Sequence, residues 1–257
     1  MEQTARASEF TQLHKPGQPV VLFNAWDAGS AKAVAAAGAT AIATGSWSVA
    51  GAQGFGDGQQ IPLDFLLQIA ERICEAVDLP VSIDFEGAYD STPEGSANNV
   101  ARLIEAGAVG MNFEDQVVGE QGLHDVNLQS ERIQAIREKA DSLCSNFYIN
   151  ARTDVFLKES NTSQHSALFD LAAQRATAYA AAGASGFFAP GLVEAVLIER
   201  MCQHSALPVN VMMKAGVPSI QQLAELGVAR VSYGPGPFVQ MLAWLQEQAQ
   251  AALSPGA

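Results

Sequence analysis

The sequence predicts an α/β protein, a (β/α)8 barrel of the TIM type. Short apolar runs alternate with segments of helical length along all 257 residues, and one helix-to-strand junction recurs four times. Near-continuous apolar runs are typical of parallel strands that are buried on both faces. Eight such units in about 250 residues match the size of a (β/α)8 barrel. A doubly wound open sheet remains the alternative.

The predicted strands are the eight apolar runs of the chain, at 20–25, 39–46, 80–86, 109–115, 147–154, 186–191, 208–213 and 230–236. The segments between them, such as 64–77 and 130–140, are rich in Ala, Leu and Glu and suit crossover helices. Residues 2–14 predict an additional helix at the N-terminus. No Pro- or Ser-rich linker interrupts the pattern, so residues 1–257 are expected to form one domain.

The recurring junction places a glycine between a helix and the next strand. It reads AAAGATAI at 35–42, IEAGAVGMN at 104–112, AAAGASGFF at 180–188 and AELGVARVS at 224–232. Glycine is the residue that best accepts the left-handed backbone just after a helix end. Four uses of one junction indicate a repeated βα unit.

The net charge of the chain argues against some classes of binding partner. The chain has 14 Lys and Arg against 27 Asp and Glu, a formal net charge of −13. An acidic surface argues against nucleic acid and anionic membranes as partners, while a locally positive or metal-containing site still admits a small anionic substrate. No apolar stretch approaches the roughly 18 residues of a membrane span. The N-terminus lacks a signal-peptide pattern, and the three cysteines are scattered, so we expect a cytoplasmic protein.

Acidic residues gather where the predicted strands end. Asp84 and Glu86 end the strand at 80–86, and alternation predicts that both point to the same side. Glu114 ends the next strand, and Asp57 lies in the loop after the strand at 39–46. Arg152 lies at the end of the strand at 147–154. The carboxyl ends of barrel strands are where active sites of this fold lie, so these side chains are expected to converge.

Crowded carboxylates repel one another unless a cation lies between them. Oxygen ligands without neighbouring His or Cys suit Mg²⁺ or Mn²⁺, and Mg²⁺ uses one or two carboxylates and keeps several waters. The alternative for Asp84 and Glu86 is a solvated surface turn.

Two further features suit anion binding. The Arg152 guanidinium can grip a carboxylate or phosphate with two parallel hydrogen bonds, or it can form a salt bridge to a neighbouring acid. The segment ATGSWS offers backbone N–H groups and the hydroxyls of Thr44, Ser46 and Ser48 to an anionic oxygen. An ordinary polar loop is the alternative there.

Several segments together resemble the isocitrate lyase/phosphoenolpyruvate mutase family. They are FNAWDAGSAKAVAAAGATAIATGS, GFGDG, VSIDFEGAY, NNVARLIEAGAVGMNFEDQ, ERIQAIREKA and INARTD, in family order from about residue 20 to residue 236. The resemblance implies a (β/α)8 barrel whose last helix swaps between subunits, giving homodimers or homotetramers. It also implies Mg²⁺, or Mn²⁺, at the acidic mouth.

The resemblance implies roles for individual residues. Asp84 looks like the principal metal-linked aspartate, while Glu86 and Glu114 look like the acids that hold metal-bound waters. Asp57 matches the acid beside the substrate, and Arg152 matches the arginine that grips it. The family's carboxylate-binding loop corresponds to Gly45, Ser46 and Trp47. The usual pattern there is Ser-Gly or Ser-Ala, so Trp47 departs from it and implies a reshaped pocket.

The loop after the fourth strand reads EDQVVGEQGLHDVN. It lacks both the Lys-Lys/Arg-Cys-Gly-His stretch of the family's isocitrate-type lyases and the Lys-x-Asn-Ser stretch of its mutases. The chain therefore resembles the phosphoenolpyruvate mutase-like branch. His124 and Glu120 are the loop residues that could supply a proton, and His124 could equally face solvent.

The resemblance implies a Mg²⁺-dependent lyase or mutase. It would act on a small 2-oxo acid or its enol phosphate, through an enolate-like intermediate and C–C or P–C cleavage. C–C cleavage, such as decarboxylation of an oxaloacetate-like acid, is slightly favoured over phosphoryl rearrangement. Two alternatives stay open: a metal-free aldolase that uses Lys214 as a Schiff base, and a non-catalytic barrel that binds a metabolite.

Overall fold

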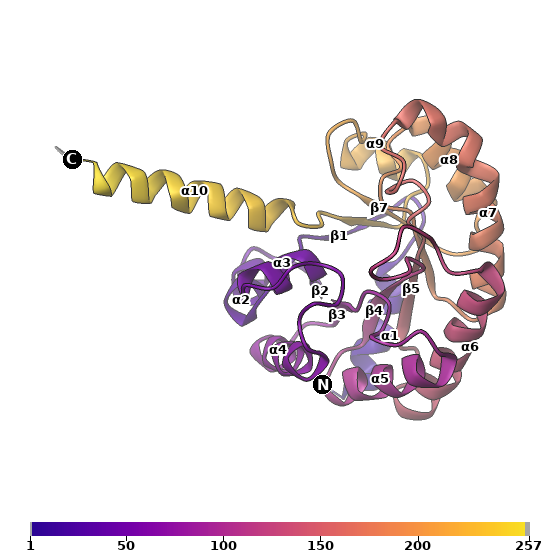
Figure 1. The fold of residues 1–257 in the computed structure, drawn as a ribbon, viewed down its shortest axis with the longest axis horizontal. Coiled ribbons are helices and arrows are strands. Elements are labelled where there is room, and N and C mark those ends of the chain that lie inside the picture. Colours follow the sequence, from indigo (N-terminus) through magenta and orange to yellow (C-terminus); the bar gives the residue numbers. More distant parts are fainter. Residues whose placement is uncertain (1, 255–257) are drawn as a thin grey trace.

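Eight parallel strands form a nearly closed barrel in the computed structural model, which describes residues 2–254 (Figure 1). The strands are β1 (Val20–Leu22), β2 (Ile42–Ala43), β3 (Val81–Asp84), β4 (Gly110–Glu114), β5 (Tyr148–Arg152), β6 (Gly186–Phe188), β7 (Val209–Met212) and β8 (Arg230–Ser232). Each strand from β2 to β7 pairs with the next one along the chain, and β8 pairs with β1. The predicted barrel is therefore confirmed, and the open-sheet alternative is wrong.

The seam between β1 and β2 is held by a single bridge and one side chain. Ala25 pairs with Thr44 in parallel, and the Ala25 N–H donates to the Ala43 carbonyl at 2.8 Å. The Asn24 side chain donates to the Thr44 carbonyl at 2.7 Å and accepts from the backbone N–H groups of Tyr233 and Gly234. Asn24 thus ties together the ends of β1, β2 and β8.

Helices cover the outside of the barrel between successive strands. They are α2 (Ala28–Ala36), α4 (Leu63–Ala76), α5 (Pro93–Glu105), α6 (Val126–Leu143), α7 (His165–Ala181), α8 (Ala195–His204) and α9 (Ile220–Glu225). The four junction glycines, Gly38, Gly107, Gly183 and Gly227, have φ values of 94°, 97°, 97° and 89°. Their predicted left-handed role is confirmed.

Three short elements are additions to the repeat. The N-terminal helix α1 (Gln3–Leu13) covers the amino-terminal end of the barrel, where Gln3 donates to the carbonyls of Ile104 and Ala108 just before β4. Helix α3 (Ser46–Ala52) and the 3₁₀ turn η1 (Thr162–Gln164) follow β2 and β5. The helix predicted over 2–14 is therefore confirmed, whereas the loop expected after the second strand is the start of a helix.

The strands are shorter than the apolar runs predicted, and this changes how the acids are placed. Strand β3 ends at Asp84, and Glu86 follows in a turn in which Glu86, Ala88 and Tyr89 all have positive φ, between 49° and 59°. Glu86 lies outside the strand, so the argument that strand alternation places Asp84 and Glu86 on one side is wrong. The turn, which the apolar run does not reveal, is what sets the direction of Glu86.

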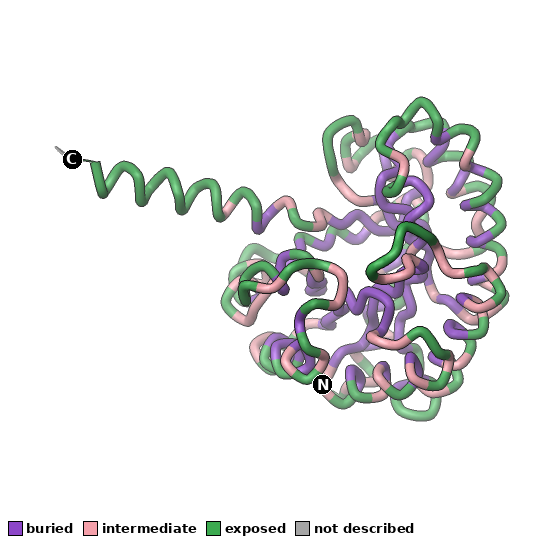
Figure 2. The backbone as a smooth tube through the Cα atoms, viewed as in Figure 1, coloured by how far each residue is buried: buried purple, intermediate pink, exposed green. Residues whose placement is uncertain are grey.

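The helix that follows the eighth strand, α10 (Gly236–Leu253), extends away from the barrel (Figure 1). Only Pro237 and Phe238 at its start are buried, and the rest is almost entirely exposed along its length (Figure 2). Five large apolar side chains of this helix are more than two-fifths exposed: Val239, Leu242, Trp244, Leu245 and Leu253. Within residues 2–254, no helix combines the length and apolar character needed to cross a membrane.

A buried histidine joins α1 to the barrel floor. His14 is 5% exposed, donates from Nδ1 to the Phe10 carbonyl at 2.8 Å, and stacks on Tyr148 with ring centroids 4.0 Å apart. Burial and the nearby Arg230 charge lower the pKa of His14 to about 3. The folded protein therefore keeps this ring neutral at any moderate pH.

The neutral ring makes stability depend on pH. Below pH 6.5 the unfolded chain protonates His14 while the folded chain does not, so the free energy of unfolding falls as the pH falls towards 3. Between pH 7 and pH 5 we expect the wild type to lose about 2 kcal/mol more than a His14→Phe variant, which keeps the stacked ring. Urea unfolding at the two pH values measures this. Equal losses in the two proteins would show that His14 is not held neutral.

Candidate active site

A cavity of about 180 Å³ opens at the carboxyl ends of the strands. Six of the residues predicted for the site border it: Gly45, Ser46, Trp47, Asp57, Asp84 and Arg152. They come from β2, β3 and β5 and the segments that follow them. The convergence that the sequence predicted at this end of the barrel is thus present for these six residues, whereas the predicted Glu86 and Glu114 do not border the cavity.

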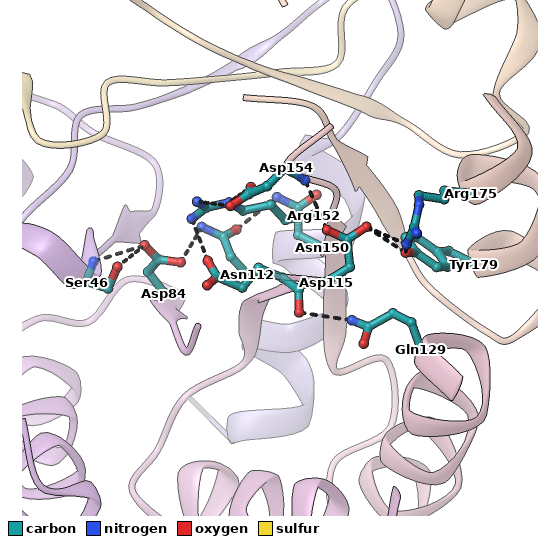
Figure 3. A network of polar contacts seen from close by, with 11 residues as sticks. Ser46, Asp84, Asn112, Asp115, Gln129, Asn150, Arg152, Asp154, Arg175 and Tyr179 are labelled. Atoms are coloured by element: carbon teal, nitrogen blue, oxygen red, sulfur yellow. Dashed lines mark hydrogen bonds and ion pairs between the residues drawn. The ribbon is translucent and has the colours of Figure 1, made fainter. Parts of the chain in front are cut away.

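Asp84 is fixed on one side of its carboxylate. Its Oδ2 accepts from both the backbone N–H and the hydroxyl of Ser46, each at 2.9 Å (Figure 3). Its Oδ1 has only a long contact, 3.3 Å, from the Asn112 amide. The carboxylate is 8% exposed, borders the cavity and has one weakly engaged oxygen, so it is placed to accept a ligand there.

Arg152 lies between two carboxylates. Its Nε and Nη2 donate to the two oxygens of Asp154 at 2.6 and 2.9 Å, and its Nη1 lies 3.0 Å from Glu114 Oε2. Burial opposes the charged form, but Glu114 and Asp154 raise the pKa of Arg152 well above its usual range. The salt-bridge role that the sequence left open for Arg152 is therefore present, on a side chain that also borders the cavity.

The other acids at the mouth, Glu86, Glu114 and Asp57, have too little positive charge near them, and their pKa values are raised. Burial, followed by Asp84 and Asp57, raises the pKa of Glu86 to about 7, although the Gln59 backbone N–H donates to its Oε2 at 2.8 Å. Burial also raises the pKa of Glu114 well above its usual range, despite the nearby Arg152. Partial burial and then Asp84 raise the pKa of Asp57, which lies more openly at the cavity edge. These shifts are what carboxylates show when a counter-charge is lacking.

The donors present fit a hard divalent cation that keeps most of its water. Within residues 2–254, no three His, Cys, Asp or Glu side chains lie close enough to form a metal-ligand group. A site with one direct carboxylate, Asp84, and further acids around it is the kind that Mg²⁺ adopts. Glu86 and Glu114 lie within electrostatic reach of Asp84 and can hold metal-bound waters.

Asp115 is a structural acid, although it follows Glu114 directly in the chain. It is completely buried and accepts from Arg175 Nη1 at 2.9 Å, from the Tyr179 hydroxyl at 2.8 Å and from the Asp154 N–H at 3.0 Å (Figure 3). Successive residues point to opposite sides, so Asp115 faces α7 while Glu114 faces Arg152. Asp115 therefore fastens the ends of β4 and β5 to α7.

Two hydroxyls proposed for anion binding are placed elsewhere. Thr44 accepts from the Asp84 backbone N–H at 2.9 Å, and Ser48 is buried; neither borders the cavity. Ser46 does border it, but its N–H and hydroxyl both donate to Asp84. The Ser46 loop thus orients Asp84 in this structure rather than offering these donors to an anion.

His124 and Lys214 do not border the cavity. His124 lines a neighbouring cavity of about 320 Å³ with Glu120 and Arg132, and burial together with the Arg132 and Arg175 charges lowers its pKa. Lys214 is exposed in the segment after β7. Among the described residues no cysteine borders the cavity either, since Cys74 and Cys144 are buried and Cys202 lies in α8.

A belt of asparagines, which the sequence analysis did not identify, lies beneath the cavity. Asn150 donates to Asn112 Oδ1 at 2.9 Å and to Asn210 Oδ1 at 3.0 Å, and Arg230 Nη2 donates to Asn112 Oδ1 at 3.1 Å. The signal in the sequence is a single amide inside an apolar strand, in GMNFE, YINAR and VNVM. A buried polar side chain in a strand needs a partner, and strands β4, β5 and β7 supply one another's.

Three comparisons with known proteins agree on a family. The family model for phosphoenolpyruvate phosphomutase matches residues 10–253. A crystal structure of a Burkholderia cenocepacia protein named a "putative phosphonomutase" superposes with a TM-score of 0.95, is 46% identical and covers 98% of this chain and 100% of that one. The 2-methylisocitrate lyase of Escherichia coli is 29% identical over 213 residues, which are 77% of this chain and 69% of the lyase.

A more distant structure shares the fold. It is a phosphonopyruvate hydrolase in complex with oxalate and Mg²⁺, with a TM-score of 0.78 and 17% identity, and the match covers 98% of this chain and 92% of that one.

Two aspartates should respond oppositely to removal of their charge. Asp84→Asn should leave the free energy of unfolding unchanged or raised, because it relieves repulsion at the mouth, and should weaken Mn²⁺ binding at least tenfold. Asp115→Asn should cost about 3 kcal/mol of stability, because it leaves Arg175 buried without a counter-charge, and should keep Mn²⁺ affinity in folded protein. Urea unfolding and calorimetric titration measure the two effects. Equal Mn²⁺ affinity in the wild type and Asp84→Asn would exclude Asp84 as the metal-linked acid.

Proposed function

The chain belongs to the phosphoenolpyruvate phosphomutase family of the isocitrate lyase superfamily, and we propose that it is a Mg²⁺- or Mn²⁺-dependent lyase that cleaves a carbon–carbon bond in a small 2-oxo acid. The observation that carries this proposal is the cluster of Asp57, Asp84, Glu86 and Glu114 near Arg152, of which Asp57, Asp84 and Arg152 border one small cavity. The superfamily consists of lyases, mutases and hydrolases, so enzymatic activity is the expectation for a member that keeps this cluster.

The cation would be held chiefly by Asp84, with Glu86 and Glu114 holding its waters. When bound, it supplies positive charge that stabilises an enolate oxygen as charge develops there. The relative that was crystallised with oxalate and Mg²⁺ supports the same type of cation here. Ser46 holds Asp84 in its orientation through two hydrogen bonds, so it contributes to the site indirectly.

Arg152 and Asp57 are proposed to act on the substrate. Arg152 borders the cavity and is kept charged and rigid by Asp154 and Glu114, so it can orient a carboxylate without losing its place. Asp57 borders the same cavity and has a raised pKa, so it is the acid best suited to exchange a proton with substrate. Gly45 and Trp47 complete the wall on the α3 side.

The balance of charges favours carbon–carbon over phosphorus–carbon cleavage. A phosphoryl group carries close to two negative charges and is bound by several cationic donors. Arg152 is the single basic side chain among the described residues that border the cavity, and the loop 115–127 contains no Lys or Arg. The Schiff-base alternative is disfavoured because Lys214 is exposed and does not border the cavity.

The decisive experiment is a substrate screen with controlled metal. Protein stripped with a chelator and reloaded with Mg²⁺ or Mn²⁺ should release pyruvate from a panel of 2-oxo acids more readily than it forms phosphoenolpyruvate or pyruvate from phosphonates. Chelated protein should be inactive, because the enolate charge then lacks its counter-charge. Full turnover in metal-free protein would overturn the proposal. Metal-dependent binding of 2-oxo acids without turnover would favour the non-catalytic alternative.

We also propose that the protein is a dimer, or a pair of dimers, held by exchange of α10. In a barrel the eighth helix covers the groove beside β1, but here a groove of about 700 Å³ lined by Pro19, Val21, Phe23, Val34 and Ala37 stays open. Val21 and Phe23 are 37% and 42% exposed there. The exposed apolar side chains of α10 are the matching surface on the same chain, so a second copy can supply the missing cover.

Charges placed on α10 should therefore dissociate the assembly. The double variant Leu242→Glu/Trp244→Glu should elute as a monomer, because each charge would have to enter an apolar groove. Multi-angle light scattering at micromolar concentration measures this. Val196→Glu is the matched control, because Val196 is 74% exposed on α8 and its variant should keep the wild-type mass. A monomeric wild type would contradict helix exchange.

A further inference from the structure

One half of the cavity wall is apolar, and this half points to the substrate. Building on the proposed function, we propose that the enzyme takes 4-hydroxy-2-oxo monocarboxylic acids whose fourth carbon carries an uncharged, apolar group. The C3–C4 bond breaks, its electron pair forms the enolate of pyruvate, the fourth carbon leaves as an aldehyde or ketone, and the proton of its hydroxyl passes to the Asp57 carboxylate.

Four side chains form the apolar part of the wall: Leu157, Phe188, Pro190 and Met212. Trp47 adds apolar surface after β2, on the side of the acids, and the polar Ser232 borders the cavity on β8, paired with Met212. Leu157 and Met212 would be among the residues that select the apolar group.

The order of the strands separates the two halves. The acids Asp57, Asp84, Glu86 and Glu114 come from β2, β3, β4 and the segments after them. Phe188 ends β6, Met212 ends β7, and Leu157 follows β5. Arg152 on β5 lies at the boundary, with its guanidinium carbon 6.0 Å from the centroid of the Phe188 ring. A substrate carboxylate near Asp84 and Arg152 would thus direct its other end towards β6 and β7.

Two of the apolar side chains are unusually exposed for their size. Trp47 is 43% exposed and Leu157 is 40% exposed, both at the cavity. Exposed apolar surface around a small cavity gains free energy when a ligand covers it. An apolar substituent would cover it, whereas a carboxylate or phosphonate would lose hydration there and find no cationic donor, with the Ser232 hydroxyl as the neighbouring polar group.

The charge at the cavity also favours a substrate whose distal group is uncharged. Five carboxylates, those of Asp57, Asp84, Glu86, Glu114 and Asp154, surround the guanidinium of Arg152. Arg152 is the single basic side chain among the described residues that border the cavity, and Glu114 and Asp154 already engage it, so the carboxylate of the 2-oxo acid uses the positive charge that Arg152 and the cation can offer. A second anionic group would be repelled, and the nearby lysines, Lys158 and Lys214, are exposed and do not border the cavity.

A pair of nearly isosteric ligands tests this directly. In 4-methyl-2-oxopentanoate, an unreactive analogue that lacks the hydroxyl needed for cleavage, an isopropyl group occupies the position of the distal carboxylate of oxaloacetate. Calorimetric titration of Mg²⁺-loaded wild type should give at least tenfold tighter binding for 4-methyl-2-oxopentanoate than for freshly dissolved oxaloacetate. From pyruvate to 2-oxobutanoate, affinity should rise about fourfold, the value for one buried methylene group. Tighter binding of oxaloacetate than of its isopropyl counterpart would overturn the inference.

Two leucines with similar exposure provide matched variants. Leu157 is 40% exposed at the cavity, while Leu171 is 43% exposed on α7 and does not border it. Leu157→Ser should weaken 4-methyl-2-oxopentanoate about fivefold, by loss of roughly 1 kcal/mol of apolar contact, and Leu171→Ser should not. Neither change should alter the affinity for oxalate, which has no apolar substituent. Equal 4-methyl-2-oxopentanoate affinity in the two variants would exclude Leu157 from the substrate wall.

Oxalate separates failure of this inference from failure of the proposed function. If Mg²⁺-dependent oxalate binding is present but the isopropyl ligand binds no better than oxaloacetate, the apolar specificity is wrong and the metal-dependent 2-oxo acid site remains. If oxalate does not bind with Mg²⁺, the proposed function itself fails, and the specificity built on it fails as well.

Discussion

A single guanidinium, that of Arg152, serves a cluster of carboxylates that the barrel gathers at one end. Because parallel strands all end at the same edge, acids at the ends of β3 and β4 cannot move apart. Arg152 is already paired with Asp154 and Glu114, so it neutralises little of Asp84 or Glu86. Burial and the remaining repulsion from Asp84 and Asp57 raise the pKa of Glu86, and a cation would relieve both effects at this site. Asp115 is paired with Arg175, so it does not add to the unpaired negative charge of this cluster.

Uncharged amide side chains lie directly beneath the cluster of carboxylates. Asn112, Asn150 and Asn210 cross the barrel interior as amides, which donate and accept hydrogen bonds without adding charge beneath an already anionic mouth. Arg230 is buried under them with one hydrogen bond to Asn112, and its charge also keeps His14 neutral. The amides therefore connect the base of the barrel to Asp84 through the contact between Asn112 and Asp84 Oδ1.

The sequence predicted the fold more completely than the directions of its side chains. The junction glycines and apolar runs are local signals, and Gly38, Gly107, Gly183 and Gly227 have the backbone that those signals required. The acids at the mouth could be found because strand ends share one edge. Their directions could not, since Glu86 depends on a left-handed turn and Asp115 depends on Arg175 and Tyr179, which lie 60 and 64 residues away in the chain. The asparagine belt was overlooked because each amide is a single polar residue in an apolar strand.

The charged residues of the mouth and the residues that set the shape of the cavity lie in different kinds of segment. Asp84, Glu114 and Arg152 lie at strand ends, where backbone pairing with neighbouring strands fixes their positions. Trp47 and Leu157 lie in segments after the strands, where a change of side chain disturbs no ladder. A replacement of an acid would therefore alter the charge balance on which the whole mouth depends, whereas a replacement of Trp47 or Leu157 would change mainly the space beside it. Trp47 and Leu157 are therefore the positions at which we expect a difference in substrate shape to act, while the acids keep the charge balance of the mouth.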